Sequence, residues 1–408
     1  MDAGPARRRS AGFSLAELVA TLVVLGLAVW LVLRLVDRRT RVAAPEGPVS
    51  RTAAAGEASL RAIVRDVRAA GTGGLSADDA FRLVEDNTTS AGRYLYRTAG
   101  GGVVVVRNGT DQLDLRGVIR SPLVAVPARD EGSGELLSDR VRARPDAAAV
   151  RLAAGKAVAA VRARLREIAP PLKAFFLLRD AAGRWAVARV ASLVEGPPES
   201  TLELVLDFTD PDARALNHGA DPAAATRLGD VSAGGVFDDL VWFVAQGEEG
   251  RPPDFIRASD PASLGFPHPY LASATNIGGG LWDIRRAGED VEDLQVAWSL
   301  SGPAGSAVWR GDTADSSAPL AGELSDATGR PLLKALKIGL TVKSAHRLER
   351  SAGAPPPDVP RLFNAAPFGK IPGAAPVGWD VVPRRRVSFD RETRESVVAP
   401  PALLETGP

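Results

Sequence analysis

The chain has 408 residues, a formal net charge of +1 and no cysteine. Balanced charge gives no reason to expect nucleic acid as a partner, and none is predicted. The lack of cysteine excludes disulfides, thiol chemistry and cysteine-based metal sites. Hydrophobic residues make up 45% of the chain but aromatic residues only 5%, which is typical of a core built on aliphatic side chains.

A long apolar run begins near the N-terminus, directly after the basic stretch Arg7–Arg9. From Phe13 to Leu33 the only formally charged residue is Glu17. At about 1.5 Å per residue, a helix over this run is long enough to cross the hydrocarbon core of a bilayer. In a secretory signal the small residues of the cleavage site follow the apolar core, whereas here Gly12 precedes it. We therefore predict a membrane-spanning helix that cleavage after Gly12 would retain.

The basic leader, Gly12, Phe13 and Glu17 together resemble the class III signal of type IV pilins and type II secretion pseudopilins. The resemblance implies that a prepilin peptidase cleaves after Gly12 and that the new N-terminus, Phe13, is methylated. It also implies that Glu17 neutralises the terminal amine of an adjacent subunit during filament assembly. An acid in a spanning helix costs up to about 3 kcal/mol unless it finds such a partner. A plain signal anchor with a chance glutamate is the alternative.

Beyond the apolar run, Pro45 and Pro48 interrupt the helical pattern, which resumes with apolar residues at helical spacing and stops at Gly71. The predicted segments are a cleaved leader over 1–12, a transmembrane and filament-core helix over 13–36, a kink or linker over 37–50, and an amphipathic helix over 51–71. Residues 72–408 are predicted to form a β-rich globular head, with an inserted lobe at about 120–275.

Strand patterns dominate after Gly74, beginning with a predicted hairpin around the turn Gly100–Gly102. Residues 147–168 have helical spacing and are predicted to form a helix. Further strands are predicted at Phe175–Leu178, Trp185–Val194, Thr201–Phe208, Val236–Ala245 and Leu332–Val342. Trp185, Trp242 and Trp298 are predicted to be core residues. With the resemblance, these patterns predict an α+β, pilin-like fold: a long N-terminal helix, transmembrane and then amphipathic, packed on the antiparallel sheet of an enlarged head.

Short phrases of the head resemble minor pilins of the PilW class. The first is the end of a helix, Leu60 to Gly71, and the second is Gly109 to Gly117, with Asp111 and Arg116. The third is an acidic turn that leads into a strand, Gly288 to Trp298, and the fourth is a basic segment followed by a strand near the C-terminus, Arg384 to Phe389. The resemblance implies a minor pilin that helps to initiate or prime type IV pilus assembly within a minor-pilin complex, with roles in cell adhesion and twitching motility.

The implied partners are other minor pilins and the major pilin, the prepilin peptidase, the inner-membrane assembly platform and membrane lipid. The implied localisation is a single pass of the inner membrane with the head in the periplasm, and later the pilus at the cell surface. One alternative is a type II secretion pseudopilin of the J type. Another is a membrane-anchored periplasmic adhesin or binding module.

Catalytic motifs are not found, and the three histidines of the chain are widely separated in the sequence. Hard oxygen ligands for calcium could come from Asp207, Asp210 and Asp212, but their spacing does not match an EF-hand loop, so we predict a solvated turn. The sequence therefore predicts that the protein is not an enzyme, with no catalytic residue, no cofactor and no metal.

Overall fold

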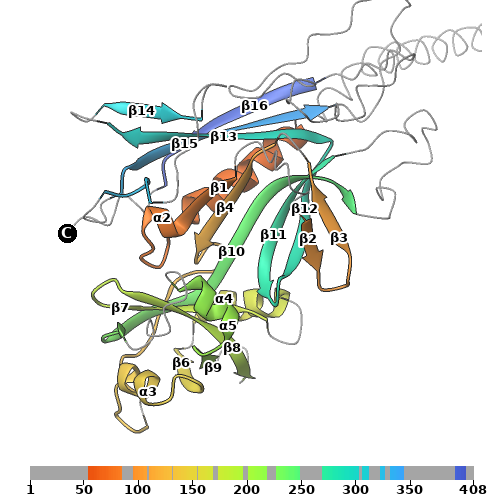
Figure 1. Ribbon diagram of the computed structural model, residues 1–408. Helices are drawn as coiled ribbons and strands as arrows, with labels where there is room; N and C mark the ends of the chain where they lie inside the picture. Colours follow the sequence, from red (N-terminus) through yellow and green to blue (C-terminus); the bar gives the residue numbers. More distant parts are fainter. Residues whose placement is uncertain are drawn as a thin grey trace, which may run out of the picture. The chain divides into compact units, whose positions relative to one another are not determined.

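The computed structural model describes residues 54–84, 95–107, 110–130, 132–153, 155–168, 173–195, 201–217, 227–248, 269–302, 306–311, 322–326, 331–343 and 391–400 (Figure 1). The chain divides into two compact units, Met1–Arg51 and Thr52–Pro408, and every described residue belongs to the second. Strands account for 51% of the described residues and helices for 21%, so the second unit is mainly a β structure.

The strand β10, Val231–Glu248, organises the larger sheet, as Figure 1 shows in green. Its first half pairs with β5 and β7, and its second half with β3, β4 and β11. Gly234 and Gly235 lie in the first half, where an added Cβ would lie 2.6 Å from Phe176 and Val118 respectively. Glycine at these two positions therefore permits neighbouring residues to approach the strand closely.

The sheet around β10 has twelve strands in the described part of the chain, in the order β11-β12-β2-β3-β10-β7-β8-β9-β6, with β1, β4 and β5 attached beside this path. Their bounds are β1 Phe81–Val84, β2 Leu95–Thr98, β3 Val103–Val106, β4 Gln112–Gly117, β5 Val124–Ala125, β6 Ala148–Leu152, β7 Phe175–Asp180, β8 Trp185–Glu195, β9 Leu202–Asp207, β11 Tyr270–Gly278 and β12 Leu281–Glu289.

Five of these strands close into a ring, because β11 pairs with both β12 and β10 while β2 and β3 complete the circuit. The β12–β2 pairing is parallel and the others are antiparallel. The ring has its own core, in which Tyr96 stacks on Phe243 at 4.7 Å and meets Trp282 edge-on at 5.0 Å. The predicted hairpin around Gly100–Gly102 is confirmed as β2 and β3.

A lobe with a separate core is built on β6, β7, β8 and β9. Its helices are α3 Leu137–Ala143 and α4 Lys156–Glu167, and α5 Pro211–Leu216 contacts β8. The lobe lies within residues 120–275, where the sequence suggested an insertion. The helix predicted over 147–168 is wrong in its first part. Ala148, Val150 and Leu152 are buried in alternation, and this period of two places them on β6, paired with β9.

A second sheet has the order β14-β13-β15-β16 and is antiparallel throughout. Its strands are β13 Val291–Ser301, β14 Ala307–Arg310, β15 Leu333–Lys343 and β16 Arg391–Val398. The helix over residues 54–69 packs between this sheet and β10, as Figure 1 shows, and α2, Ala77–Ala80, follows it. The core there includes Trp242 and Trp298, and Trp185 is also buried, so the prediction for these tryptophans is confirmed.

The predicted pilin-like fold with a long N-terminal helix is wrong. The described residues form a large twelve-stranded sheet and a smaller sheet, and no long apolar helix is found among them. The helix over residues 54–69 buries one stripe, which includes Ile63 and Val67, while Arg61 and Arg68 are exposed. Its role is therefore to fill the space between two sheets. The alternating aliphatic residues that follow favour strands, so the sheets dominate the fold.

Within the described ranges, no helix combines the length and the apolar character needed to cross a membrane. This finding contradicts the predicted localisation, which was a single inner-membrane pass with a periplasmic head and later a place in the pilus at the cell surface. The predicted leader 1–12, spanning helix 13–36 and linker 37–50 lie outside the described residues.

Candidate functional site

The residues predicted for processing and assembly, Gly12, Phe13 and Glu17, lie outside the described residues. Their roles therefore stay predictions. The three phrases that resemble minor pilins can be located, because Leu60 to Gly71, Gly109 to Gly117 and Gly288 to Trp298 fall largely within the described ranges. The basic segment at Arg384 to Phe389 does not.

The first two phrases meet where the helix over residues 54–69 ends. The backbone N–H of Gly71 donates to the carbonyl of Arg116 at 2.9 Å, and Val118 donates to the carbonyl of Thr72 at 3.0 Å. Gly117 has a φ of 142°, and a Cβ added there would lie 3.0 Å from the backbone nitrogen of Gly71. Only glycine suits both this backbone conformation and this close approach.

The second and third phrases meet at Asp111, which is fully buried. Its backbone N–H donates to the carbonyl of Leu294 at 2.9 Å, and its carboxylate accepts from the N–H of Val296 at 2.7 Å. Asp111 thus connects the start of β4, in the large sheet, to β13 in the smaller sheet. A buried carboxylate bonded to a backbone N–H is among the stronger hydrogen bonds in proteins.

The third phrase also touches the helix just before the first phrase. A Cβ added at Gly288 would clash with the hydroxyl of Ser59, which precedes Leu60 on the helix. Asp290, at the acidic turn, has a φ of 57°, a left-handed conformation that Asp tolerates better than most residues. A one-residue bend at Asp290 separates β12 from β13, so the predicted strand does follow the acidic residues.

The polar residues of the second phrase continue into a network on β10. Arg116 donates from Nε to Asp239 at 2.8 Å, and Asn276 donates to the other carboxylate oxygen at 2.9 Å. Burial, and then the negative charge of Asp239, raises the pKa of Asp114 from 3.8 to about 7, although Arg116 and Arg82 oppose this shift. Asp114 is therefore a carboxyl group that gains a proton near neutral pH.

Asp238, the neighbour of Asp239, forms a second ion pair on the other face of β10. Arg164 of α4 donates to it at 2.6 Å, and the backbone N–H of Arg120 donates to its other oxygen at 2.8 Å. The side chain of Asp238 is 0% exposed and that of Arg164 is 2% exposed. Loss of one partner from such a buried pair typically costs about 3–5 kcal/mol, because the remaining charge is stranded. The pair therefore holds α4 of the lobe against β10.

Asp210 and Asp212, in the predicted solvated turn with Asp207, accept backbone hydrogen bonds. Asp210 caps α5 by accepting from Asp212 and Ala213, each at 3.0 Å, and Asp212 accepts from Gly279 at 2.7 Å. In the part of the chain that the structure describes, no group of three or more His, Cys, Asp or Glu side chains is arranged to hold a metal ion.

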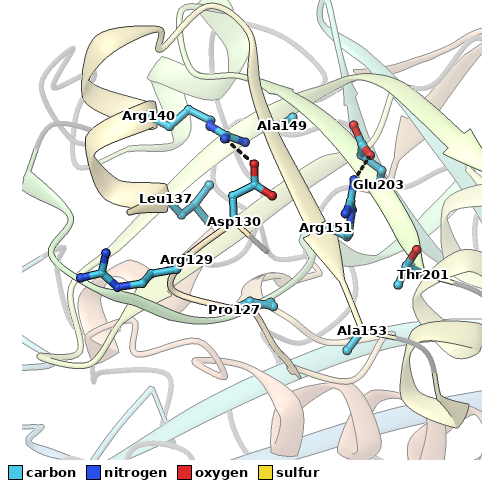
Figure 2. Close-up of a pocket in the computed structure, with 10 residues that line it drawn as sticks. All are labelled: Pro127, Arg129, Asp130, Leu137, Arg140, Ala149, Arg151, Ala153, Thr201 and Glu203. Atoms are coloured by element: carbon cyan, nitrogen blue, oxygen red, sulfur yellow. Dashed lines mark hydrogen bonds and ion pairs between the residues drawn. The ribbon is translucent and has the colours of Figure 1, made fainter. Parts of the chain in front are cut away.

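A small pocket of about 150 Å³ lies in the lobe (Figure 2). Four of its charged side chains form ion pairs, Arg140 with Asp130 at 2.6 Å and Arg151 with Glu203 at 3.3 Å, and the fifth, Arg129, donates to the carbonyl of Gly134 at 2.9 Å. The hydrogen bond from Arg140 lowers the pKa of Asp130 to about 2, so this carboxylate stays charged. Pockets that hold small molecules usually have 300–1,000 Å³. The lobe pocket is smaller, and its carboxylates and two of its arginines are already held in ion pairs.

Comparison of the chain with protein-family models, with curated proteins and with solved structures finds no match. The functional argument therefore rests on the residues themselves. Sequence reasoning found Asp111, Arg116 and Gly117 through their phrase, but it missed Asp238 and Asp239, which lie inside an apolar strand. Two adjacent acids in such a strand are a signal of buried ion pairs that could have been used.

We expect Asp111→Ala to lower the free energy of unfolding by about 2–3 kcal/mol, because it leaves the buried N–H of Val296 without an acceptor. Asp111→Asn keeps an acceptor oxygen and should lose less. Urea unfolding of the full chain, followed by circular dichroism, measures both values. Equal stability of Asp111→Ala and the unaltered chain would show that the contact between the sheets does not depend on Asp111.

We expect the stability of the protein to depend on the protonation of Asp114. Its pKa is raised in the folded state, so the folded chain binds more protons than the unfolded chain between about pH 4 and pH 7. The free energy of unfolding therefore falls as the pH rises through this range, by about 1.4 kcal/mol for each unit of pKa difference. Asp114→Asn, which cannot ionise, should be more stabilising at pH 8 than at pH 5.

Thermal unfolding of Asp114→Asn and of the unaltered chain at pH 5 and pH 8 measures the difference in stability between the two proteins at each pH. The contributions of other titratable groups cancel in this difference. Asp139→Asn is the matched control, because Asp139 is half exposed and pairs only at the surface with Arg142. A stability difference between Asp114→Asn and the unaltered chain that is the same at pH 5 and pH 8 would contradict the raised pKa.

Proposed function

We propose that the chain is a structural subunit of the minor-pilin type, which helps to initiate or prime the assembly of a type IV pilus together with other minor pilins. The observation that carries the proposal is that three phrases resembling this class, separated in the sequence, lie together in the head, where the second contacts both the first and the third. Gly71 bonds to Arg116, Asp111 bonds to Leu294 and Val296, and Ser59 packs against Gly288. Chance likenesses would have no reason to share one junction.

The junction explains what each phrase contributes to an assembly subunit. Glycine at 71 and 117 lets the helix end approach β4, and Asp111 locks β4 to β13. Arg116 then extends the junction to Asp239 in the middle of β10. The junction thus connects the helix and both sheets at several points. This property suits a subunit whose work is assembly and not turnover.

The leader supplies the proposed assembly contact. Cleavage after Gly12 would leave the amine of Phe13 at the N-terminus, and Glu17 would lie four residues beyond it. A carboxylate there can neutralise the amine of an adjacent subunit, which sets the register between subunits. The proposed partners are accordingly other minor pilins, the major pilin, the prepilin peptidase and the assembly platform. A subunit that keeps Glu17 accepts another chain's N-terminus, which argues against the outermost tip position.

We expect the mature protein to begin at N-methylated Phe13 only in cells that contain the prepilin peptidase. Intact-mass measurement and N-terminal sequencing of protein from cells with and without the peptidase test this expectation. The peptidase-free strain should yield the uncut chain, which serves as the reference mass. An uncut N-terminus in both strains would remove the basis for a pilin-type leader.

We expect Glu17→Ala to leave the head folded but to lower co-purification with other pilin subunits by about tenfold, because the subunit amine loses its charge partner. Glu57→Ala is the matched control, since Glu57 pairs only with the exposed Arg61 one helical turn away. Quantitative mass spectrometry of the purified complexes gives the ratio. Unchanged recovery of partners with Glu17→Ala would refute the assembly role of this residue.

A further inference from the structure

A cleft of about 610 Å³ opens beside the Asp238 ion pair, within the size range of pockets that bind small molecules. Six elements contribute to its lining: the helix over residues 54–69, the loop after β4, the end of α4, and the strands β10, β11 and β12. The polar lining residues are Arg65, Arg120, Ser121, Glu167, Ser273 and Arg285. Trp242 and the side chains of Ala62, Ile119, Pro122 and Ala287 supply the apolar part.

Three arginines, Arg65, Arg120 and Arg285, line the cleft together with one carboxylate, Glu167. Arg65 and Arg285 have side chains that are 71% and 41% exposed, so their guanidinium groups are accessible to a ligand. Arg65 pairs with the buried Asp66, and Arg285 pairs with Glu167 at 3.6 Å and with Asp283 at 3.1 Å. Each guanidinium has five N–H donors, so these pairs leave donors available.

Arg120 lies deeper in the cleft, with its side chain 14% exposed. Its Nη2 donates to Asp66 at 3.0 Å and to the hydroxyl of Ser273 at 3.1 Å. Its Nε is buried and has no hydrogen-bond partner among the described residues. Asp66 and Ser273 therefore fix the guanidinium in place while one donor remains unused. A guanidinium held in this way is preorganised for an anionic oxygen.

Trp242 provides the second unused donor. Trp242 lines the cleft and is 1% exposed, and its indole Nε1 has no acceptor among the described residues. A buried donor without a partner costs about 1–3 kcal/mol, so an acceptor that reaches it is favoured by a similar amount. The indole ring also offers an apolar surface beside the arginines. A ligand that suits the cleft would therefore carry hydrogen-bond acceptor oxygens next to a nonpolar group.

We propose that this cleft binds a carboxylate group carried on an apolar body. A carboxylate matches the fork geometry of arginine and accepts hydrogen bonds without donating any. The apolar walls distinguish such a ligand from a fully hydrated inorganic anion. The carboxylate has two sources, an acidic side chain within a peptide segment or a free organic acid, and both present the same chemistry to the arginines. The binding site does not depend on the proposed role in pilus assembly.

The test uses the full chain labelled with 5-fluorotryptophan, titrated with butyrate and followed by fluorine nuclear magnetic resonance. The chain has seven tryptophans, and the signal missing from the labelled Trp242→Phe protein identifies Trp242. We expect the Trp242 signal to shift saturably, while the signals of the tryptophans outside the cleft stay in place. No shift of the Trp242 signal up to about 100 mM butyrate, a concentration at which even millimolar sites are occupied, would overturn the proposal.

The variants Arg65→Gln and Arg285→Gln remove the two accessible guanidinium groups and keep the deeper Asp66–Arg120 contact, so the fold should persist. We expect each to weaken butyrate binding about fivefold to tenfold, through the loss of a charge-assisted hydrogen bond. Arg151→Gln is the matched control, because Arg151 forms a similar half-exposed pair with Glu203 in the lobe. Equal affinity of all three variants would overturn the assignment of the arginines.

Two further titrations distinguish the ligands. A short blocked peptide with one aspartate between leucines that binds at least tenfold more tightly than butyrate would support the site and identify a peptide segment as the source. Equal or weaker binding of that peptide would support the site with a free organic acid as the source. Tighter binding of inorganic phosphate than of butyrate would overturn the assignment to a carboxylate.

Discussion

The two adjacent carboxylates of β10, Asp238 and Asp239, are the constraint on which the larger sheet depends. The side chains of successive residues in a strand point to opposite faces of the sheet, so the two acids pair with partners on opposite faces. Asp238 holds Arg164 of the lobe, and Asp239 holds Arg116 of β4 together with Asn276 of β11. Burial makes each unpaired charge costly, which means that these elements must come together when β10 folds.

A second constraint connects the two sheets, and Asp111 supplies it by bonding to both Leu294 and Val296. The helix over residues 54–69 then fills the space between the sheets with Ile63 and Val67. The phrases that resemble minor pilins lie at this connection and not at the exposed surface. Their residue types follow from packing: glycine for close backbone approach, and aspartate for a buried acceptor.

Beside Asp238 the same architecture leaves a cleft that contains unmatched hydrogen-bond donors. The cleft beside Asp238 has cationic side chains from separate elements and the unused donors of Arg120 and Trp242. The arginines of the cleft have carboxylate partners, as Arg140 and Arg151 of the lobe pocket do, so the unused donors distinguish the cleft. The proposed assembly role and the proposed carboxylate site are compatible, because they involve different residues. The first depends on the junction of the sheets at Asp111, and the second on the cleft beside Asp238.

Local pattern by itself determined the strands with regular alternation, the β2–β3 hairpin, the acidic turn at Asp290 and the burial of Trp242, because each depends on neighbouring residues. Local pattern also misled, since Ala148–Leu152 has alanine-rich spacing typical of a helix but pairs with β9. Only the tertiary structure decided the β-dominated fold, the ring of five strands and the pairing of the polar strand β16 with β15, as these depend on contacts between residues far apart in the sequence. The cleft was also decided by the tertiary structure: Arg65, Arg120 and Arg285 have no local signal in common, and they come from a helix, a loop and a strand that meet only in the folded chain.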